Sequence, residues 1–575
     1  AVGSLALYLN TTADNNVAVG YQALKENTTG HSNVAVGANA LDANTTASAN
    51  TAVGYNVLTA NTTGSSLTAV GYAAMDSNTT GSNNTAFGRG TLDANTTADL
   101  NSAFGYLALA ANTTGTVNTA VGANALDANT TANHNTAIGY ESLGANTTAA
   151  ENTALGSKTL QTNTTGAANT ASGYLSLNAN TTGSSNAAFG KDSLAANTTG
   201  NANVAVGKDA LKANTTASNN TAVGTDALTA NTTGYDNVAV GRNALDANVG
   251  GHSNTALGES SLTSNTEGDR NVAVGQNALA VNSTGGSNVA VGRGALDANT
   301  TASNNTAVGD LAASALTTGA ANVAIGTNAL AASTTGARNT IVGVDSSNQI
   351  SSGSDNTAVG FDSLTRCTTG GSNTCIGKDS GDNITNGALN TFVGIDSGTN
   401  ITQGSSHVCI GSSTIASAEN AQNEIVIGAS ITGVGSNSFT FGKAGNRVSN
   451  DFDINASWTR ASDIRKKRNI KDDTLGLEFI NDLNTKTFQW KPNNEFPKEW
   501  DDYNEENKMN LDVVMHGLIA QDVKSALDKQ GVDTFGGWVE GKDGMQNVSR
   551  EMFVTPLIKA VQELSTQVDE LKQEL

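Results

Sequence analysis

Proline, aromatic residues, cysteine and positive charge are all scarce in this chain of 575 residues. It contains only 3 prolines and 4 tryptophans, and every one of them lies after residue 450. This change in composition indicates a domain boundary near residues 430–460. The formal net charge of −21 argues against nucleic acid as a partner, because a surface that binds phosphates must be basic.

Long apolar segments are missing as well, so we expect no insertion into a membrane. The 5 histidines and 3 cysteines show no metal-ligand spacing, and we expect neither a metal nor a cofactor. We interpret Cys367, Cys375 and Cys409 as small buried thiols. The chain shows no signal peptide and begins within a repeat at Ala1, which we interpret as a processed or truncated amino terminus.

A repeat of 17 residues fills the first three-quarters of the chain, and Asn118–His134 (NTAVGANALDANTTANH) is one copy. Its Gly122 recurs every 17 residues from Gly3 to Gly428 without a slip, which gives 26 successive repeats. We call this residue the anchor glycine. A fixed period in this range is typical of a solenoid, in which each repeat forms one coil stacked on the previous coil.

The order of residues within a repeat predicts how a coil is built. The alternating segment N-[T/V]-A-[V/I/F/L] before the anchor glycine predicts a short strand, and the leucine four places after it, such as Leu211, predicts a second strand. N-T-T followed by glycine or alanine predicts a turn. We therefore expect two strands and two turns per coil. We expect Val206 and Leu211 to line the lumen and Ala205 to face a crowded contact, either the lumen or another chain.

The turn asparagine is present in 18 consecutive repeats, from Asn10 to Asn299. Stacked coils would align these side chains, so that each amide can satisfy the next one. Asn-Thr-Thr is also an acceptor sequence for glycosylation. We favour the buried ladder, because the fold already explains the spacing.

The N-T-A-V-G repeats resemble the YadA-like head repeats of trimeric adhesins and phage fibres. Members of that family form left-handed parallel β-rolls, three side by side. The resemblance implies that the β-solenoid of residues 1–432 is a trimeric parallel β-roll. The residue patterns further along predict a β-rich neck over 433–461 and a small α+β domain over 462–575, so we expect a mainly β protein.

The last domain is expected to contain a helix over 475–483, a strand over 485–490 and an amphipathic helix over 551–575. In the final helix an apolar heptad seam runs through Leu557, Val561, Leu564, Val568, Leu571 and Leu575. Such a seam fits either a helix that packs on its own domain or a coiled coil between chains. We favour a coiled coil over residues 553–575.

Three segments of this domain resemble the endosialidase-type intramolecular chaperones: Ser462–Ile470 (SDIRKKRNI), Gly517–Val523 (GLIAQDV) and Pro556–Leu564 (PLIKAVQEL). Members of that family trimerise, help a β-rich stalk to fold, and then cut themselves off. The resemblance implies that Ser462 is the nucleophile and Lys467 the base. It places the cut beside Ser462, at the Ala461–Ser462 bond or at Ser462–Asp463.

The chemistry of this pair is plausible by itself, because a serine becomes a good nucleophile when a neighbouring lysine takes its proton. Cationic neighbours favour the neutral form of Lys467, and three of them surround it in sequence: Arg465, Lys466 and Arg468. A spacing of five residues does not bring the two side chains to one face of a helix, so we expect them to meet in a turn or across a trimer. The alternative is a basic surface loop.

We therefore predict a homotrimeric bacteriophage tail fibre or spike, located in the virion tail, whose only catalysis is self-cleavage. The expected partners are other virion tail proteins and a host-surface receptor, either a glycan or an outer-surface protein. The alternatives are a trimeric adhesin on a bacterial surface, a glycan-degrading spike and an ice-binding rod.

Overall fold

The computed structural model describes residues 1–575 except 454–458, 461, 499–502, 504, 508–510 and 542–543. The chain divides into two compact units, Ala1–Ala461 and Ser462–Leu575. Each unit has its own hydrophobic core.

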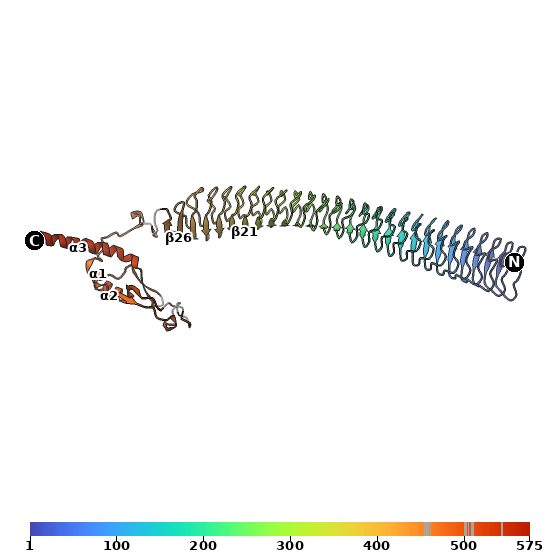
Figure 1. Ribbon diagram of the computed structural model, residues 1–575, viewed down its shortest axis with the longest axis horizontal. Coiled ribbons are helices and arrows are strands. Elements are labelled where there is room, and N and C mark those ends of the chain that lie inside the picture. The colour runs from blue at the N-terminus through green and yellow to red at the C-terminus, as the bar shows by residue number, and fades with distance from the viewer. Residues whose placement is uncertain (454–458, 461, 499–502, 504, 508–510, 542–543) are drawn as a thin grey trace. The chain divides into compact units, whose positions relative to one another are not determined.

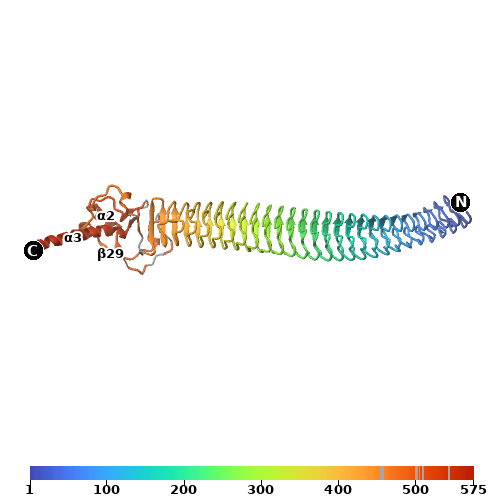
Figure 2. The same ribbon diagram turned by 90° about the horizontal axis from the view of Figure 1, so that it is seen from above.

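The first unit is a β-solenoid, drawn in blue to orange in Figures 1 and 2. Each coil from the second onward contributes one short strand, and neighbouring strands pair in parallel with partners 17 residues apart, such as Val17 with Val34. The strands are β1 (Val17–Val19), β2 (Val34–Val36), β3 (Thr51–Val53), β4 (Thr68–Val70), β5 (Thr85–Phe87), β6 (Ser102–Phe104), β7 (Thr119–Val121), β8 (Thr136–Ile138), β9 (Thr153–Leu155), β10 (Thr170–Ser172), β11 (Ala187–Phe189), β12 (Val204–Val206), β13 (Thr221–Val223), β14 (Val238–Val240), β15 (Thr255–Leu257), β16 (Val272–Val274), β17 (Val289–Val291), β18 (Thr306–Val308), β19 (Val323–Ile325), β20 (Thr340–Val342), β21 (Thr357–Val359), β22 (Thr374–Ile376), β23 (Thr391–Val393) and β24 (Val408–Ile410). The predicted β-solenoid of 17-residue repeats is confirmed.

The predicted second strand of each coil is wrong. In the repeat of Gly122, both Asn124 and Leu126 adopt the left-handed conformation, with φ of 55° and 53°. Left-handed backbone costs a leucine about 1–2 kcal/mol, whereas burying its side chain contributes about 1.5–3 kcal/mol. Burial therefore outweighs the strain. The leucine is carried into the lumen by a tight bend, and its N–H donates to Ser142 of the next coil.

The lumen is lined by alanine and leucine, and the expectation that Val206 lines it is wrong. Ala205 and Leu211 are fully buried, while the side chain of Val206 is 37% exposed on the outer face. The middle residue of a three-residue strand points opposite to its two neighbours. Because leucine already occupies the lumen, only a small residue fits across from it. The expected crowded contact of Ala205 is therefore the lumen.

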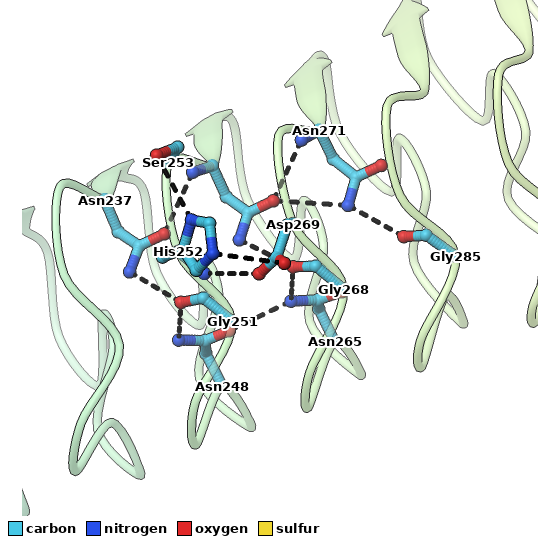
Figure 3. A network of polar contacts seen from close by, with 11 residues as sticks. Asn237, Asn248, Gly251, His252, Ser253, Asn265, Gly268, Asp269, Asn271 and Gly285 are labelled. Carbon is cyan, nitrogen blue, oxygen red and sulfur yellow. Dashed lines mark hydrogen bonds and ion pairs between the residues drawn. The ribbon is translucent and has the colours of Figure 1, made fainter.

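Two columns of buried asparagines hold the coils together (Figure 3). In the turn column, the amide of Asn265 donates to Oδ1 of Asn248 at 2.9 Å and to the carbonyl of Gly268 at 3.0 Å. In a second column at the start of the strands, the main-chain N–H of Asn271 donates to Oδ1 of Asn254 at 2.9 Å. The turn asparagines from Asn27 onward are fully buried, which confirms the ladder and excludes their glycosylation in the folded chain.

The anchor glycine is required by both conformation and space. Gly122 has φ of +136°, a region that side chains avoid, and a Cβ there would overlap the carbonyl oxygen of Gly139 in the next coil. This close contact of consecutive coils explains why the glycine never changes along the solenoid.

The three cysteines are free and buried, as expected. Burial raises the pKa of the thiols of Cys367 and Cys409 to about 12 and raises the pKa of Cys375 as well. Because the thiolate is the reactive form, these cysteines are unreactive lumen side chains.

The regular coils end in a different arrangement of strands. β25 (Ile425–Ala429) and β26 (Ser438–Lys443) still pair in parallel, but β27 (Asn446–Asp451) pairs antiparallel with β26, and β28 (Thr459–Arg460) with β27. The β26–β27 hairpin falls in the segment predicted as a neck over 433–461, of which residues 454–458 and 461 lie outside the described part. β26 is the last parallel strand, and β27 covers its edge, which would otherwise be open to pairing.

The second unit is a small α+β structure that ends in a long helix. Its core contains Phe479, Val523, Leu527 and Phe553, and the rings of Phe479 and Phe553 stack at 6.1 Å. The predicted helix, strand and closing helix are present. The elements are η1 (Ile464–Lys466), α1 (Leu477–Asp482), β29 (Thr485–Phe488), η2 (Asn493–Glu495), β30 (Met515–Leu518), α2 (Ala520–Lys529), β31 (Trp538–Glu540), β32 (Gln546–Val548), η3 (Arg550–Phe553) and α3 (Val554–Glu574).

Candidate functional site

The segment that opens the second unit is a single turn of 3₁₀ helix, η1. Asp463 caps this turn, because its carboxylate accepts a hydrogen bond from the main-chain N–H of Arg465 at 2.8 Å. The turn is closed when the N–H of Lys467 donates to the carbonyl of Ile464 at 3.0 Å. Aspartate is among the preferred caps of a helical turn, so this local structure follows directly from the sequence.

The turn brings the two predicted catalytic side chains into contact. Nζ of Lys467 donates to Oγ of Ser462 at 2.7 Å, which is hydrogen-bonding distance. The sequence left open whether the pair would meet in a turn or across a trimer, and the contact forms in a turn of one chain. Ala461, on the other side of one predicted cut, lies outside the described residues, whereas the Ser462–Asp463 bond lies within them.

Asp463 also binds the side chain of Arg465. Its two carboxylate oxygens accept from Nε and Nη2 of the guanidinium at 3.0 and 2.6 Å. These hydrogen bonds hold the pKa of Asp463 below its usual range. The sequence had suggested that Arg465 would crowd Lys467 with like charge. The structure instead pairs Arg465 with Asp463, which stiffens the turn.

The site is open to solvent within its own unit. Ser462 and Lys467 are exposed, and the flanking side chains of Ile464 and Ile470 are 70% and 61% exposed. A lysine acts as a base when it is neutral, and removal from water favours the neutral form. The turn therefore supplies the contact between nucleophile and base. The described part of the unit does not by itself bury Lys467 away from water, as the neutral form of the lysine requires.

The GLIAQDV segment serves packing. Gly517 lies in β30, where a Cβ would come within 2.9 Å of the guanidinium of Arg550 and 3.2 Å of the ring of Phe488. The glycine thus lets η3 approach the β29–β30 hairpin. The remainder of the segment enters α2, which buries Val523.

The closing helix joins the same structure through Glu563, a contact that sequence reasoning missed. Its carboxylate accepts a hydrogen bond from the main-chain N–H of Leu477 at 2.7 Å, at the start of α1. A glutamate in the middle of an amphipathic helix gave no sign of this role, because its partner is 86 residues away.

One face of α3 packs on its own unit and another face is open. Pro556 and Ala560 are buried. The heptad residues are between 40% and 64% exposed, and they are Leu557, Val561, Leu564, Val568 and Leu571. Beside the start of this seam lies an open groove, lined by Ile480, Leu518, Phe553 and Leu557 together with His516 and Arg550.

Within the described part of the chain, no cluster of three or more histidine, cysteine or acidic side chains is arranged to hold a metal ion. Among the same residues, no helix has both the length and the apolar character needed to cross a membrane.

Comparison with known proteins gives one match. Residues 462–532 match the family model Peptidase_S74, described as the chaperone of endosialidase. No curated protein and no solved structure matches the chain. The chain therefore combines a β-solenoid with a carboxy-terminal segment that is similar to the endosialidase chaperones.

Proposed function

We propose that this chain is the shaft of a homotrimeric tail fibre or spike of a bacteriophage, which attaches to the host surface and carries a folding chaperone that removes itself. The observation that carries the proposal is the contact between Lys467 and Ser462 at 2.7 Å, inside the segment that matches the chaperone family. A long β-solenoid precedes this segment, and such a stalk is a suitable client for a chaperone.

The outer face of the strands supports self-association. The residue before the anchor glycine is apolar in every coil except the one with Ser172. Along this column Phe87 and Phe104 stack at 5.3 Å. The most exposed member is Val2 of the first coil, at 67%, and the next most exposed members, between 36% and 47%, are Val19, Phe87, Phe104, Val121, Ile138, Leu155, Phe189, Val206, Leu257, Ile325, Val359, Ile376, Ile410 and Ile427. A continuous apolar face of this length marks an interaction surface. Further copies of the chain fit it, because they have the same coil spacing.

The open seam of α3 supplies a second self-association surface. Its 4-3 spacing is that of a coiled coil, and the five heptad side chains are between 40% and 64% exposed. A coiled coil of three such helices would hold the chains together while the solenoid forms.

The geometry of the turn supports self-cleavage. When Lys467 is neutral, the Ser462 hydroxyl can donate its proton to Nζ across the same 2.7 Å contact. Oγ then attacks the carbonyl carbon of Ala461, the protonated Lys467 gives its proton to the nitrogen of Ser462 as the C–N bond breaks, and water hydrolyses the ester that remains on Oγ. The products are a shaft that ends at Ala461 and a chaperone that begins at Ser462. Cleavage of the Ser462–Asp463 bond is the alternative.

Three variants of the full chain test the cleavage. Ser462→Ala removes the nucleophile and Lys467→Ala removes the base, so both chains are expected to stay whole. Lys466→Ala is the matched control, because among the described residues it is Lys467 and not Lys466 that bonds to Ser462, and it is expected to cut normally. Denaturing gels and intact-mass spectrometry report the products. Cutting that persists in Ser462→Ala would refute the mechanism, and so would a wild-type chain that remains intact.

A further inference from the structure

A column of exposed tyrosines follows the anchor glycine in the first half of the solenoid. Each ring is between 46% and 52% exposed, although the rings belong to coils that are otherwise tightly packed. We call these residues the tyrosine column: Tyr21, Tyr55, Tyr72, Tyr106, Tyr140 and Tyr174. The proposed self-cleavage does not use them.

The rings are held in order along the column. Tyr55 and Tyr72 stack at 5.5 Å. The guanidinium of Arg89 lies over the rings of both Tyr72 and Tyr106, at 5.6 and 5.7 Å. Such cation–π contacts fix the rings in one orientation and so reduce the entropy that a ligand would have to remove.

Small residues separate the other rings. Ala38 occupies the same position between Tyr21 and Tyr55, Ala123 between Tyr106 and Tyr140, and Ser157 between Tyr140 and Tyr174. Adjacent coils are about 4.7–4.9 Å apart. These rings therefore lie two coils apart, with a notch one coil wide between them.

Hydrogen-bonding side chains follow three of the six rings. The residue after each tyrosine adopts the left-handed conformation. It is Gln22 after Tyr21, Asn56 after Tyr55 and Glu141 after Tyr140, and it is alanine or leucine after the other three rings. Flat apolar rings next to amide and carboxylate groups match the two kinds of surface on a sugar ring, its C–H face and its hydroxyl edge.

We propose that the tyrosine column binds an extended, uncharged oligosaccharide that lies along the solenoid. A pyranose unit of an extended chain advances by about one coil rise, so every second sugar can stack on a ring two coils further on. A neutral ligand fits because the chain carries a net charge of −21. The inference rests on the proposed function and specifies the host-surface receptor as a neutral polysaccharide.

The end of the column supports this assignment. After Tyr174 the same position carries mostly charged or polar residues, such as Lys191, Lys208 and Arg242, and the one later aromatic residue there is the isolated Phe361. The coils themselves continue unchanged, with the same strand register. The aromatic rings are therefore not a requirement of the fold, and they define a limited stretch of the surface.

The experiment uses the full chain and immobilised hexamers of cello-, manno-, xylo- and chito-oligosaccharide, with maltohexaose and a hyaluronan hexamer as curled and anionic controls. The test variant is Tyr55→Ala/Tyr72→Ala/Tyr140→Ala/Tyr174→Ala. The matched control is Tyr235→Ala, which removes an exposed tyrosine that stacks on His252 at 4.8 Å outside the column. We expect wild type and control to bind at least one extended neutral hexamer, and the test variant to bind it roughly tenfold more weakly or worse.

Two results would overturn the inference: no binding of wild type to any neutral hexamer, or binding that the four substitutions leave unchanged. Sedimentation of the same proteins separates this inference from the proposed function. If the test variant loses its oligomeric state, the tyrosine column belongs to the interface between copies and the saccharide assignment is wrong. If it keeps that state but loses sugar binding, both stand. Failure of wild type to self-associate would overturn the proposed fibre instead.

Discussion

At the scale of single residues, two positions fill the lumen together: the middle residue of the strand and the residue four places after the anchor glycine. A larger side chain at one position is accompanied by a smaller one at the other. In most coils alanine in the strand faces leucine after the anchor glycine. In β23 the alanine position holds Phe392, which is fully buried, and the leucine positions of its own coil and of the coil before it hold Gly398 and Gly381. A Cβ on Gly398 would overlap the phenylalanine ring. One large residue thus replaces several medium ones.

We predict that these substitutions are strongly coupled. Phe392→Ala alone should destabilise the solenoid by about 3–5 kcal/mol by leaving a cavity. Gly398→Leu alone should also destabilise it, because the side chain meets the ring. The double variant restores the common alanine–leucine pair and should recover most of the loss. Thermal unfolding of the wild type, the two single variants and the double variant measures the loss of stability in each. Additive losses in the double variant would contradict the volume exchange.

Which strand residue faces the lumen could not be predicted from the sequence. Alternation in N-V-A-V-G predicts two faces, but a period of two is satisfied with either Val206 or Ala205 inside. The choice depends on Leu211, which reaches the lumen only through a left-handed backbone that leucine rarely adopts. For the candidate site, the motif gave Ser462 and Lys467. The pairing of Asp463 with Arg465 required the geometry of the turn.

At the scale of the structural element, the second column of asparagines, at the start of the strands, ends in a histidine. His407 occupies the asparagine position, and its main-chain N–H donates to Oδ1 of Asn390 at 3.0 Å. Its Nε2 donates to the carbonyl of Ala421 at 2.7 Å, and its Nδ1 accepts from the N–H of Glu424 at 3.3 Å. The neutral ring therefore continues the ladder. Burial lowers the pKa of His407 below its usual value.

The lowered pKa predicts that acid destabilises the last coils. Below the unfolded pKa of about 6.5 the unfolded chain binds a proton that the folded histidine does not, so stability falls as the pH decreases from there toward the folded pKa. His407→Asn restores the usual ladder residue and should remove this dependence. Melting of wild type and variant at about pH 7.5 and 5.5 brackets the window. An equal loss in both proteins would show that other groups are responsible.

At the scale of the whole molecule, each coil contacts mainly its two neighbours, and the solenoid behaves as a stack of equivalent units. We predict that deleting residues 118–134, one complete repeat, leaves a folded solenoid shorter by about 4.7–4.9 Å. Deleting residues 118–133 removes one residue fewer and shifts every later side chain out of its column, so it should prevent stacking beyond that point. Circular dichroism and electron micrographs distinguish the two. Equal tolerance of both deletions would contradict the ladder.

The proposed trimer depends on the apolar face of the strands. We predict that Val121→Lys/Ile138→Lys, which places two adjacent charges on that face, weakens self-association of the Ser462→Ala chain. Thr131→Lys/Thr148→Lys adds the same charges to exposed turn positions and is the control. Sedimentation gives the oligomeric state. If the trimer persists with the charges on the apolar face, the contact between chains lies elsewhere. If the Ser462→Ala chain is itself a monomer, the proposed trimer is wrong.

The equal spacing of the coils creates a problem of alignment. If three copies pair along the apolar face, they can do so at many staggers that differ by whole coils. Each stagger loses only the contacts of the overhanging ends. A run of near-identical repeats distinguishes the correct stagger from its neighbours only weakly. A landmark is needed, and the antiparallel hairpin of β26 and β27 provides one, because its strands depart from the 17-residue spacing. Assembly that begins at this end fixes the alignment once, and every later coil inherits it.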